Sequence, residues 1–158
     1  MKRTNMLVVL VLAFCAVASA QERLNFKVEK RADTFNNAAA EAGFQTRFGH
    51  GVHFSATVWR ASNGEGITSE FAEFRSTEEA ERYLDWELKK VKKVISLKTT
   101  VESHRWKTGR RAEALMDGRW VEIMWTDGPN FRVIIAPNFD DALQLEDRLN
   151  PSTPQSVR

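Results

Sequence analysis

The three histidines of the chain are the side chains best suited to proton transfer or metal binding near neutral pH. His50 and His53 flank Gly51-Val52, and His104 stands apart from them. A zinc site would need a third ligand, and this spacing does not place two imidazoles on one helix face. The sequence therefore predicts no metal site and no cofactor. It leaves His53 or His104 as the candidate base of a small hydrolase.

Other catalytic signatures do not occur in the sequence. It contains no nucleophile elbow, phosphate-binding loop, paired-cysteine motif or dinucleotide fingerprint. The single cysteine, Cys15, lies in a segment that we expect to be removed, which excludes a thiol nucleophile from the mature chain. These features favour a non-catalytic protein over an enzyme.

Tryptophans are the second chemical feature of the sequence, and there are five of them. Trp59 is expected to share a strand face with His53, whereas Trp120 should point away from the face that buries Trp125. Exposed indoles beside polar groups are suited to stacking against sugars or other flat ligands. The predicted ligand-binding residues are therefore Trp59, Trp120, His53 and Trp106. Cross-strand packing in the core is the alternative role for these aromatic side chains.

Charge is distributed unevenly along the chain. From Lys89 to Arg111 there are nine basic residues and one acid, whereas from Glu113 to Asp147 there are eight acids and two basic residues. Such a basic stripe could bind an acidic polymer or membrane headgroups. Part of the stripe is expected at the end of one helix, where the helix dipole favours positive charge. A solvated face is therefore the competing interpretation.

Residues 1–20 have the organisation of a cleaved secretory signal peptide. Two basic residues precede an apolar run from Met6 to Val17, and Ala18-Ser19-Ala20 ends the segment. The run is too short to span a bilayer comfortably, and the small residues suit cleavage before Gln21. Cys15 raises the alternative of a lipoprotein, but a phenylalanine precedes it where lipoprotein processing requires a small residue.

Removal of this segment changes the physical description of the chain. The net charge of +2 comes from 23 basic and 21 acidic residues, and Lys2 and Arg3 are the surplus. The mature chain is therefore neutral, so its charge gives no reason to expect nucleic acid as a partner. It also has no cysteine and must be stable by packing alone, which favours a bacterial extracytoplasmic protein, periplasmic or secreted, without stable membrane insertion after cleavage. We expect one domain over residues 21–150 and a disordered tail over 151–158.

Hydrophobic periodicity predicts one long helix at the centre of the chain. Ser76 is a good N-cap, and Glu79 stands three residues on, as in a capping box. The apolar stripe that follows runs through five turns and consists of Ala80, Leu84, Leu88, Val91 and Ile95. A second capped helix is predicted over Phe139–Leu149, with Asn138 as its N-cap. A short helix over Thr34–Glu41 would end at Gly43.

Alternation of apolar and polar residues predicts strands before and after the central helix. They cover Leu24–Val28, Val52–Trp59, Ile67–Phe74, Lys98–Trp106, Arg110–Met116, Val121–Trp125 and Phe131–Ile135. Asp117-Gly118 is the strongest hairpin signal, because a two-residue mirror-image turn needs residues that tolerate positive φ.

The two helix starts resemble each other in sequence. Ser76-Thr77-Glu78-Glu79-Ala80 and Asn138-Phe139-Asp140-Asp141-Ala142 both read as a cap, any residue, two acids and alanine. The likeness could mark an internal repeat. It is equally what cap and dipole chemistry demands at any strand-to-helix junction.

Together these elements predict an α+β fold, a mainly antiparallel sheet of about six strands with two helices packed on one face. The face left open should be partly wet, because it is expected to carry Ser55, Thr57, Arg111, Glu113, Glu122 and Arg132. Such a mixed aromatic and polar face is suited to non-catalytic binding of a glycan, a small molecule or another exported protein. The alternative function is the small exported hydrolase with His53 or His104 as its base.

Cleavage of the signal peptide is directly testable. Intact-mass measurement of the natively exported protein should give a chain that begins at Gln21, because the Ala-x-Ala end of the apolar run directs cleavage there. A mass that retains residues 1–20, or that includes lipid on Cys15, would contradict this prediction.

Overall fold

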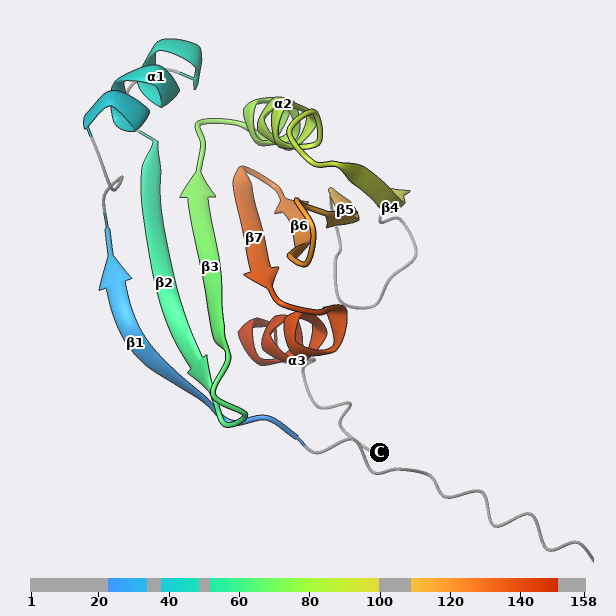
Figure 1. The fold of residues 1–158 in the computed structure, drawn as a ribbon. Helices are drawn as coiled ribbons and strands as arrows, with labels where there is room; N and C mark the ends of the chain where they lie inside the picture. Colours follow the sequence, from blue (N-terminus) through green and yellow to red (C-terminus); the bar gives the residue numbers. More distant parts are fainter. Residues whose placement is uncertain (1–22, 34–37, 49–51, 100–108, 151–158) are drawn as a thin grey trace, which may run out of the picture.

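The computed structural model describes residues 23–33, 38–48, 52–99 and 109–150 (Figure 1). The predicted signal peptide and the predicted disordered tail lie outside these residues and stay predictions. His50, His104 and Trp106 lie outside them as well.

The described residues form one antiparallel sheet and three helices. In chain order the elements are β1 (Phe26–Ala32), α1 (Ala38–Phe48), β2 (His53–Ala61), β3 (Gly66–Glu73), α2 (Thr77–Glu87), β4 (Lys93–Thr99), β5 (Arg110–Leu115), β6 (Val121–Asp127), β7 (Asn130–Ala136) and α3 (Phe139–Leu149). The strands lie in the order β1-β2-β3-β7-β6-β5-β4. The α+β class and the antiparallel sheet are confirmed, with seven strands instead of about six and with α1 as a third helix.

The helices α2 and α3 cover opposite faces of the sheet, so the prediction that both pack on one face is wrong (Figure 1). Successive residues of β6 show this arrangement. Ile123 and Trp125 pack with Leu145 of α3, whereas Met124 packs with Leu84 of α2. Strand β6 is buried at its first six positions, because it is covered on both sides. A strand of this kind reads as a nearly continuous apolar run instead of a clean alternation.

Helix α2 is shorter than the sequence predicts. It ends at Glu87 with Leu88 as its C-cap, and β4 begins at Lys93. Ile95, predicted to lie on the buried stripe, is instead 46% exposed on the edge strand. Four lysines between residues 89 and 93 repel one another in a helix, and the β-branched residues near Ile95 favour a strand. Pairing with β5 then decides the conformation.

Both predicted N-caps are confirmed. The Glu79 backbone N–H donates to the Ser76 hydroxyl at 3.3 Å, and the Asp141 backbone N–H donates to the Asn138 side chain at 2.8 Å. The reciprocal half of the capping box is displaced by one residue, since the Glu79 carboxylate accepts from the Arg75 backbone N–H at 3.2 Å. Each helix start therefore satisfies backbone donors that have no partner inside the helix.

The two similar helix starts do not mark a simple structural repeat. Strands β3 and β7 are antiparallel neighbours, and the helices that follow them, α2 and α3, lie on opposite faces of the sheet. Cap and dipole chemistry accounts for the likeness of the two starts without a repeat.

Helix α1 continues past the glycine that the sequence predicts as its end. Gly43 lies inside the helix, and Phe44 and Phe48 follow it. Both phenylalanines are buried against Phe74 and Tyr83, with ring centroids 4.9–5.8 Å apart. Burial of two phenylalanines is worth several times the roughly 1 kcal/mol that one glycine costs in a helix.

The hairpin predicted between β5 and β6 is present, but its turn is longer than two residues. The Met116 backbone N–H donates to the Trp120 carbonyl at 2.9 Å, and Gly118 has a φ of +71° while Asp117 does not reach positive φ. A mirror-image two-residue turn requires positive φ at both central residues. The two-residue turn of this sheet is Gly128-Pro129, which joins β6 to β7 with a φ of +57° at the glycine.

Two neighbouring arginines of β5 connect the sheet to the two helices. Arg110 forms ion pairs with Glu81 and with Asp85 of α2, the latter at 2.7 Å. Arg111 points to the opposite face and donates two parallel hydrogen bonds to Glu146 of α3, at 2.7 and 2.8 Å. The second pair is buried, since the side chains of Arg111 and Glu146 are 11% and 4% exposed. Such a pair is costly to break, because the remaining charge stays buried without a partner.

Replacement of Arg111 tests the importance of the buried pair. Arg111→Ala should lower the free energy of unfolding by about 3–5 kcal/mol, because Glu146 would be left buried and uncompensated. Arg60→Ala is the matched control, since Arg60 pairs with Glu29 at 2.9 Å on the surface. Its cost should stay within about 1 kcal/mol. Chemical denaturation measures both, and equal losses would contradict the assignment of Arg111 as the anchor of α3.

Candidate functional site

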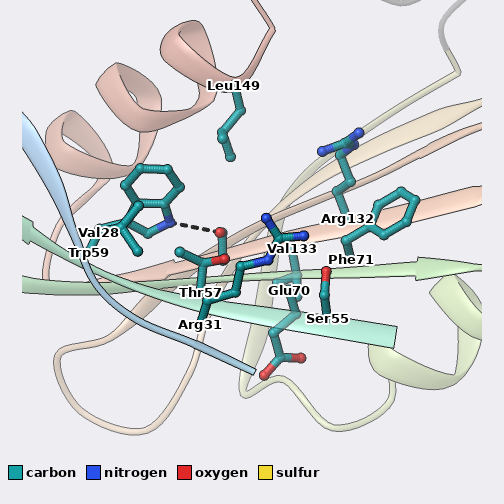
Figure 2. A pocket seen from close by; sticks show the side chains of 11 residues that line it. Val28, Arg31, Ser55, Thr57, Trp59, Glu70, Phe71, Arg132, Val133 and Leu149 are labelled. Atoms are coloured by element: carbon teal, nitrogen blue, oxygen red, sulfur yellow. Dashed lines mark hydrogen bonds between the residues drawn. The ribbon is translucent and has the colours of Figure 1, made fainter. Parts of the chain in front are cut away.

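A groove of 370 Å³ lies on the α3 face of the sheet, beside the end of α3 (Figure 2). We call it the α3-side groove. Its lining residues are Val28, Arg31, Ser55, Thr57, Trp59, Ser69, Glu70, Phe71, Arg132, Val133 and Leu149. The groove exists because α3 covers the β6–β7 part of this face and leaves the β1–β2–β3 part open.

Strand register brings the polar residues of the groove together. Thr57 of β2 is paired with Arg31 of β1 and with Ser69 of β3. One pair further along, Phe71 lies between Ser55 and Arg132. Residues that are directly opposite on neighbouring strands point to the same face, so these side chains form two adjacent rows. Glu70, one position before Phe71, points to the other side of the sheet (Figure 2).

Trp59 forms one wall of the groove, and its indole is already fixed by the protein. The indole N–H donates to the Ser69 hydroxyl at 2.8 Å, and the Arg148 guanidinium of α3 lies 5.6 Å from the ring. The ring is partly buried against the core cluster that includes Trp125. Trp59 and Trp125 therefore share a face, which corrects the expectation that Trp125 alone would lie on the helix-covered side. Trp59 remains accessible because it lies beside the part of that face that α3 does not cover.

Arg132 is the most distinctive polar group of the groove. It is half-buried, and its guanidinium lies 4.7 Å from the Phe71 ring (Figure 2). Burial lowers the pKa of Arg132, and the negative charge of Asp127 opposes that effect. Within the described part of the chain, no carboxylate forms an ion pair with this guanidinium. A desolvated cation without a counter-ion is a preorganised partner for an anion.

A second guanidinium reaches the groove from the sheet edge. Arg31 is exposed and pairs with Asp33 at 3.2 Å. Val28, on the same edge strand, and Leu149, at the end of α3, add apolar surface on the remaining sides (Figure 2). The groove therefore combines two guanidinium groups, three hydroxyl groups and two aromatic rings.

The four residues predicted to bind a ligand do not form one surface. Trp59 lines the groove, while His53 is exposed beyond its end with its ring 6.3 Å from Phe71. Trp120 is 41% exposed in the turn before β6 and is not part of the groove lining. Trp106 lies outside the described residues. Trp125 is buried as predicted, at 1% exposure.

The six polar residues predicted for an open face are divided between the two faces. Ser55, Thr57 and Arg132 line the groove. Arg111 and Glu113 lie on the same face but form ion pairs with each other and, for Arg111, with α3. Glu122 points to the α2 face. The prediction of one open face was wrong. The strand period shows which residues of a strand share a face, but it does not show how much of that face a helix covers.

The basic stripe predicted from Lys89 to Arg111 is partly used inside the protein. Lys90 pairs with Glu87 at 2.8 Å, and Arg110 and Arg111 pair with carboxylates of α2 and α3. Basic groups that already have internal partners contribute little to attraction of an acidic polymer. The structure therefore favours the interpretation of the stripe as structural and solvated charge.

A larger cavity of 640 Å³ lies on the opposite face, between α1, α2 and the sheet. We call it the α2-side cavity. It is lined by Gly43, Phe44, Arg47, Phe54, Glu70, Tyr83, Trp86, Glu87, Lys90, Met116, Glu122, Met124, Val133 and Ile135. Its lining is mainly apolar and aromatic with a few charged groups, as in typical small-molecule sites.

Three carboxylates of the α2-side cavity influence one another. Burial raises the pKa of Glu122 to about 7, and the negative charges of Glu87 and Glu70 add to this effect while Lys90 opposes it. Burial also raises the pKa of Glu70. Burial, with the negative charge of the nearby Glu87, also raises the pKa of the Tyr83 hydroxyl above its ordinary value. Strongly shifted acids in a cavity are typical of functional sites.

Sequence reasoning missed the α2-side cavity, although one signal pointed to it. Glu122 interrupts the apolar run of β6 between Val121 and Ile123. A carboxylate in a strand that is buried on both faces requires a partner or a function. The other acids, Glu70 and Glu87, come from β3 and α2, and only the fold brings them near Glu122.

The described residues show neither a metal-binding cluster nor a membrane-spanning helix. They contain no group of three or more histidine, cysteine or acidic side chains that could hold a metal ion. Within the same ranges, none of the helices has the length and apolar character needed to cross a membrane.

Comparisons of the chain with protein-family models, with curated proteins and with solved structures gave no match. The function is therefore inferred from the geometry of the two sites.

The raised pKa of Glu122 predicts a specific pH dependence of stability. The folded-state pKa of about 7 lies above the ordinary glutamate pKa of 4.5, so the folded protein holds more protons between these pH values. The contribution of Glu122 to stability is thus fully present below about pH 4.5 and is lost as the pH rises through about 7. Compared with wild type, Glu122→Gln should be nearly neutral at pH 4.5 and stabilising by roughly 1–3 kcal/mol at pH 8.

Denaturation at several pH values measures this difference. Glu73→Gln is the matched control, because Glu73 is an exposed glutamate of β3 with no place in the cavity lining. A pH-independent effect of Glu122→Gln would contradict the prediction.

Proposed function

We propose that this protein is a non-catalytic binding module that takes a small ligand with an anionic group in the α3-side groove. The observation that carries the proposal is Arg132, a half-buried guanidinium that has no ion-pair partner among the described residues. Folding has already removed part of the water around this guanidinium, so a ligand has to displace less water from it on binding. A ligand carboxylate or phosphate would therefore gain two parallel charge-assisted hydrogen bonds at low additional cost.

The remaining groups of the groove favour a ligand that joins its anionic group to a ring bearing hydroxyls. Ser55 and Thr57 offer donors and acceptors on one row, and Phe71 and Trp59 offer apolar walls on either side (Figure 2). Hydroxyl-rich rings are recognised by this combination of stacking and hydrogen bonding. The volume of 370 Å³ lies at the lower end of the range for small-ligand sites. Acidic sugars and small ring-containing organic acids fit these requirements.

The alternative of a histidine-based hydrolase is less well supported. His53 is exposed, and no ion pair joins it to Glu73, its direct neighbour on β3. A catalytic base needs a group that orients it and a pocket that holds the substrate beside it. Neither is provided to His53 by the described residues. His104 lies outside them, so the proposal rests on the groove and on no property of that histidine.

The proposed site of action is extracytoplasmic, on the basis of the predicted signal peptide at residues 1–20. An anion-binding module outside the cytoplasm would meet acidic glycans, phosphorylated metabolites and organic acids. After removal of residues 1–20 the chain contains no cysteine. Its stability therefore depends on no disulfide, and neither a reducing nor an oxidising environment is required.

Binding of paired sugars tests the proposal. Glucuronate should bind and glucose should not at the same concentration, because only the former carries a carboxylate for Arg132. Arg132→Gln should weaken glucuronate binding by about tenfold or more, the equivalent of one hydrogen bond to a charged group. Tryptophan fluorescence and NMR titration report on the groove through Trp59.

Arg119→Gln is the matched control, since Arg119 is an exposed arginine in the turn between β5 and β6. Glucuronate affinity should be unchanged in this variant and should fall with added salt in the wild type. Equal affinity of wild type and Arg132→Gln would show that Arg132 does not bind the anion. Equal binding of glucuronate and glucose would remove the basis for an anion site.

A further inference from the structure

We propose that the α2-side cavity is a second binding site, and that it takes a ligand that joins an ammonium group to an apolar body. The site lies on the opposite face of the sheet from the α3-side groove. The two share only Glu70 and Val133 among their lining residues, and the strands that carry these residues separate them. The proposal is therefore independent of the function proposed for the groove.

Glu122 supplies the first observation. It is 7% exposed, and in the described part of the chain it forms no hydrogen bond or ion pair, yet its side chain lines the cavity. Its unpaired carboxylate oxygens face the cavity, and burial of the side chain disfavours their ionised form. Glu70 lines the same cavity and likewise has no ion pair with a described residue. Two carboxylates thus face one space, and neither forms a direct ion pair with a described residue.

The cations of the cavity wall are already engaged elsewhere. The Lys90 ammonium bonds to Glu87 at 2.8 Å and lies 3.0 Å from the centre of the Trp86 ring. The Arg47 guanidinium lies 5.0 Å from the same ring. Lys90 lowers the cost of ionised Glu122 only from a distance. A cation carried by a ligand would therefore meet an unsatisfied carboxylate and would not have to displace a protein cation.

The rest of the lining shows why the cation should be organic. Phe44, Phe54 and Tyr83 present aromatic rings, and Met124 and Ile135 add apolar surface from the floor of the sheet. Aromatic rings attract ammonium groups through their negative faces, and apolar side chains favour a hydrocarbon body. A metal ion would instead need several oxygen ligands close together, and the described residues hold no such group. The volume of 640 Å³ accommodates a ring with a side chain.

Protonation of Glu122 should be linked to binding of such a ligand. The charged groups that face Glu122 are Glu70 from β3, Glu87 and Lys90 from the α2 segment and Arg47 from α1, and the Tyr83 hydroxyl is neutral. A bound ammonium favours the ionised form of Glu122. Because the pKa of Glu122 in the free protein is about 7, binding near pH 7 should release protons to the solvent.

Two probes of the same shape test the proposal on the full-length mature protein. Phenethylamine carries an ammonium group on two carbons from a phenyl ring, and 2-phenylethanol is its uncharged counterpart. At pH 8 the amine should bind at least about tenfold tighter than the alcohol, as expected for a charge-assisted contact. Calorimetry at pH 7 in two buffers of different ionisation enthalpy should show proton release with the amine and none with the alcohol.

Glu122→Gln should remove both the preference for the amine and the proton release, while Glu73→Gln should keep both. Thermal unfolding confirms that the variants are folded, and the wild-type comparison of the two probes requires no variant. Equal affinities for amine and alcohol in the wild type would overturn the proposal, as would no saturable amine binding or an amine preference that survives Glu122→Gln. Glucuronate binding should be unaffected by Glu122→Gln, so the outcome for this cavity is distinguishable from the outcome for the groove.

Discussion

Two consecutive arginines of β5 hold the three layers of this domain together. Successive residues of a strand point to opposite faces, so Arg110 reaches α2 and Arg111 reaches α3. Each guanidinium is matched by carboxylates of its helix, and the Arg111–Glu146 pair is buried. The buried pair adds little net stability, because both of its charges lose water, yet removal of either partner is costly. Together with the apolar packing of Leu84 and Leu145, the two arginines connect each helix to the sheet.

The two helices leave space on both faces of the sheet, in different ways. On one face α3 leaves part of the sheet open as the α3-side groove, where Arg132 has no ion-pair partner among described residues. On the other face α1 and α2 enclose the α2-side cavity, where Glu122 likewise forms no ion pair with a described residue. The unpaired charged groups of the two proposed sites are of opposite sign, and β3 and β7 lie between them.

Local structure could be predicted from the sequence wherever neighbours along the chain decide it. The N-caps at Ser76 and Asn138 and the α3 bounds depend on a few adjacent residues, and all are confirmed. The hairpin at Gly118 is present, but its turn is longer than the two residues predicted. The predicted end of α2 was wrong. The apolar spacing of Leu88, Val91 and Ile95 fits a helix, but pairing with β5 favours a strand in this segment. Intrinsic propensity is a weak preference that tertiary contacts override.

By itself the sequence determined the α+β class, the strand periods and the burial of Trp125, since these follow from the order and spacing of apolar residues. Only the tertiary structure decided that the helices cover opposite faces, that Trp59 lines a groove without Trp120, and that Glu122 meets Glu70 and Glu87. The physical reason is that strand alternation assigns side chains to one of two faces but contains no information about which face a later helix will cover. That choice depends on contacts between residues far apart in the chain, such as Arg111 with Glu146.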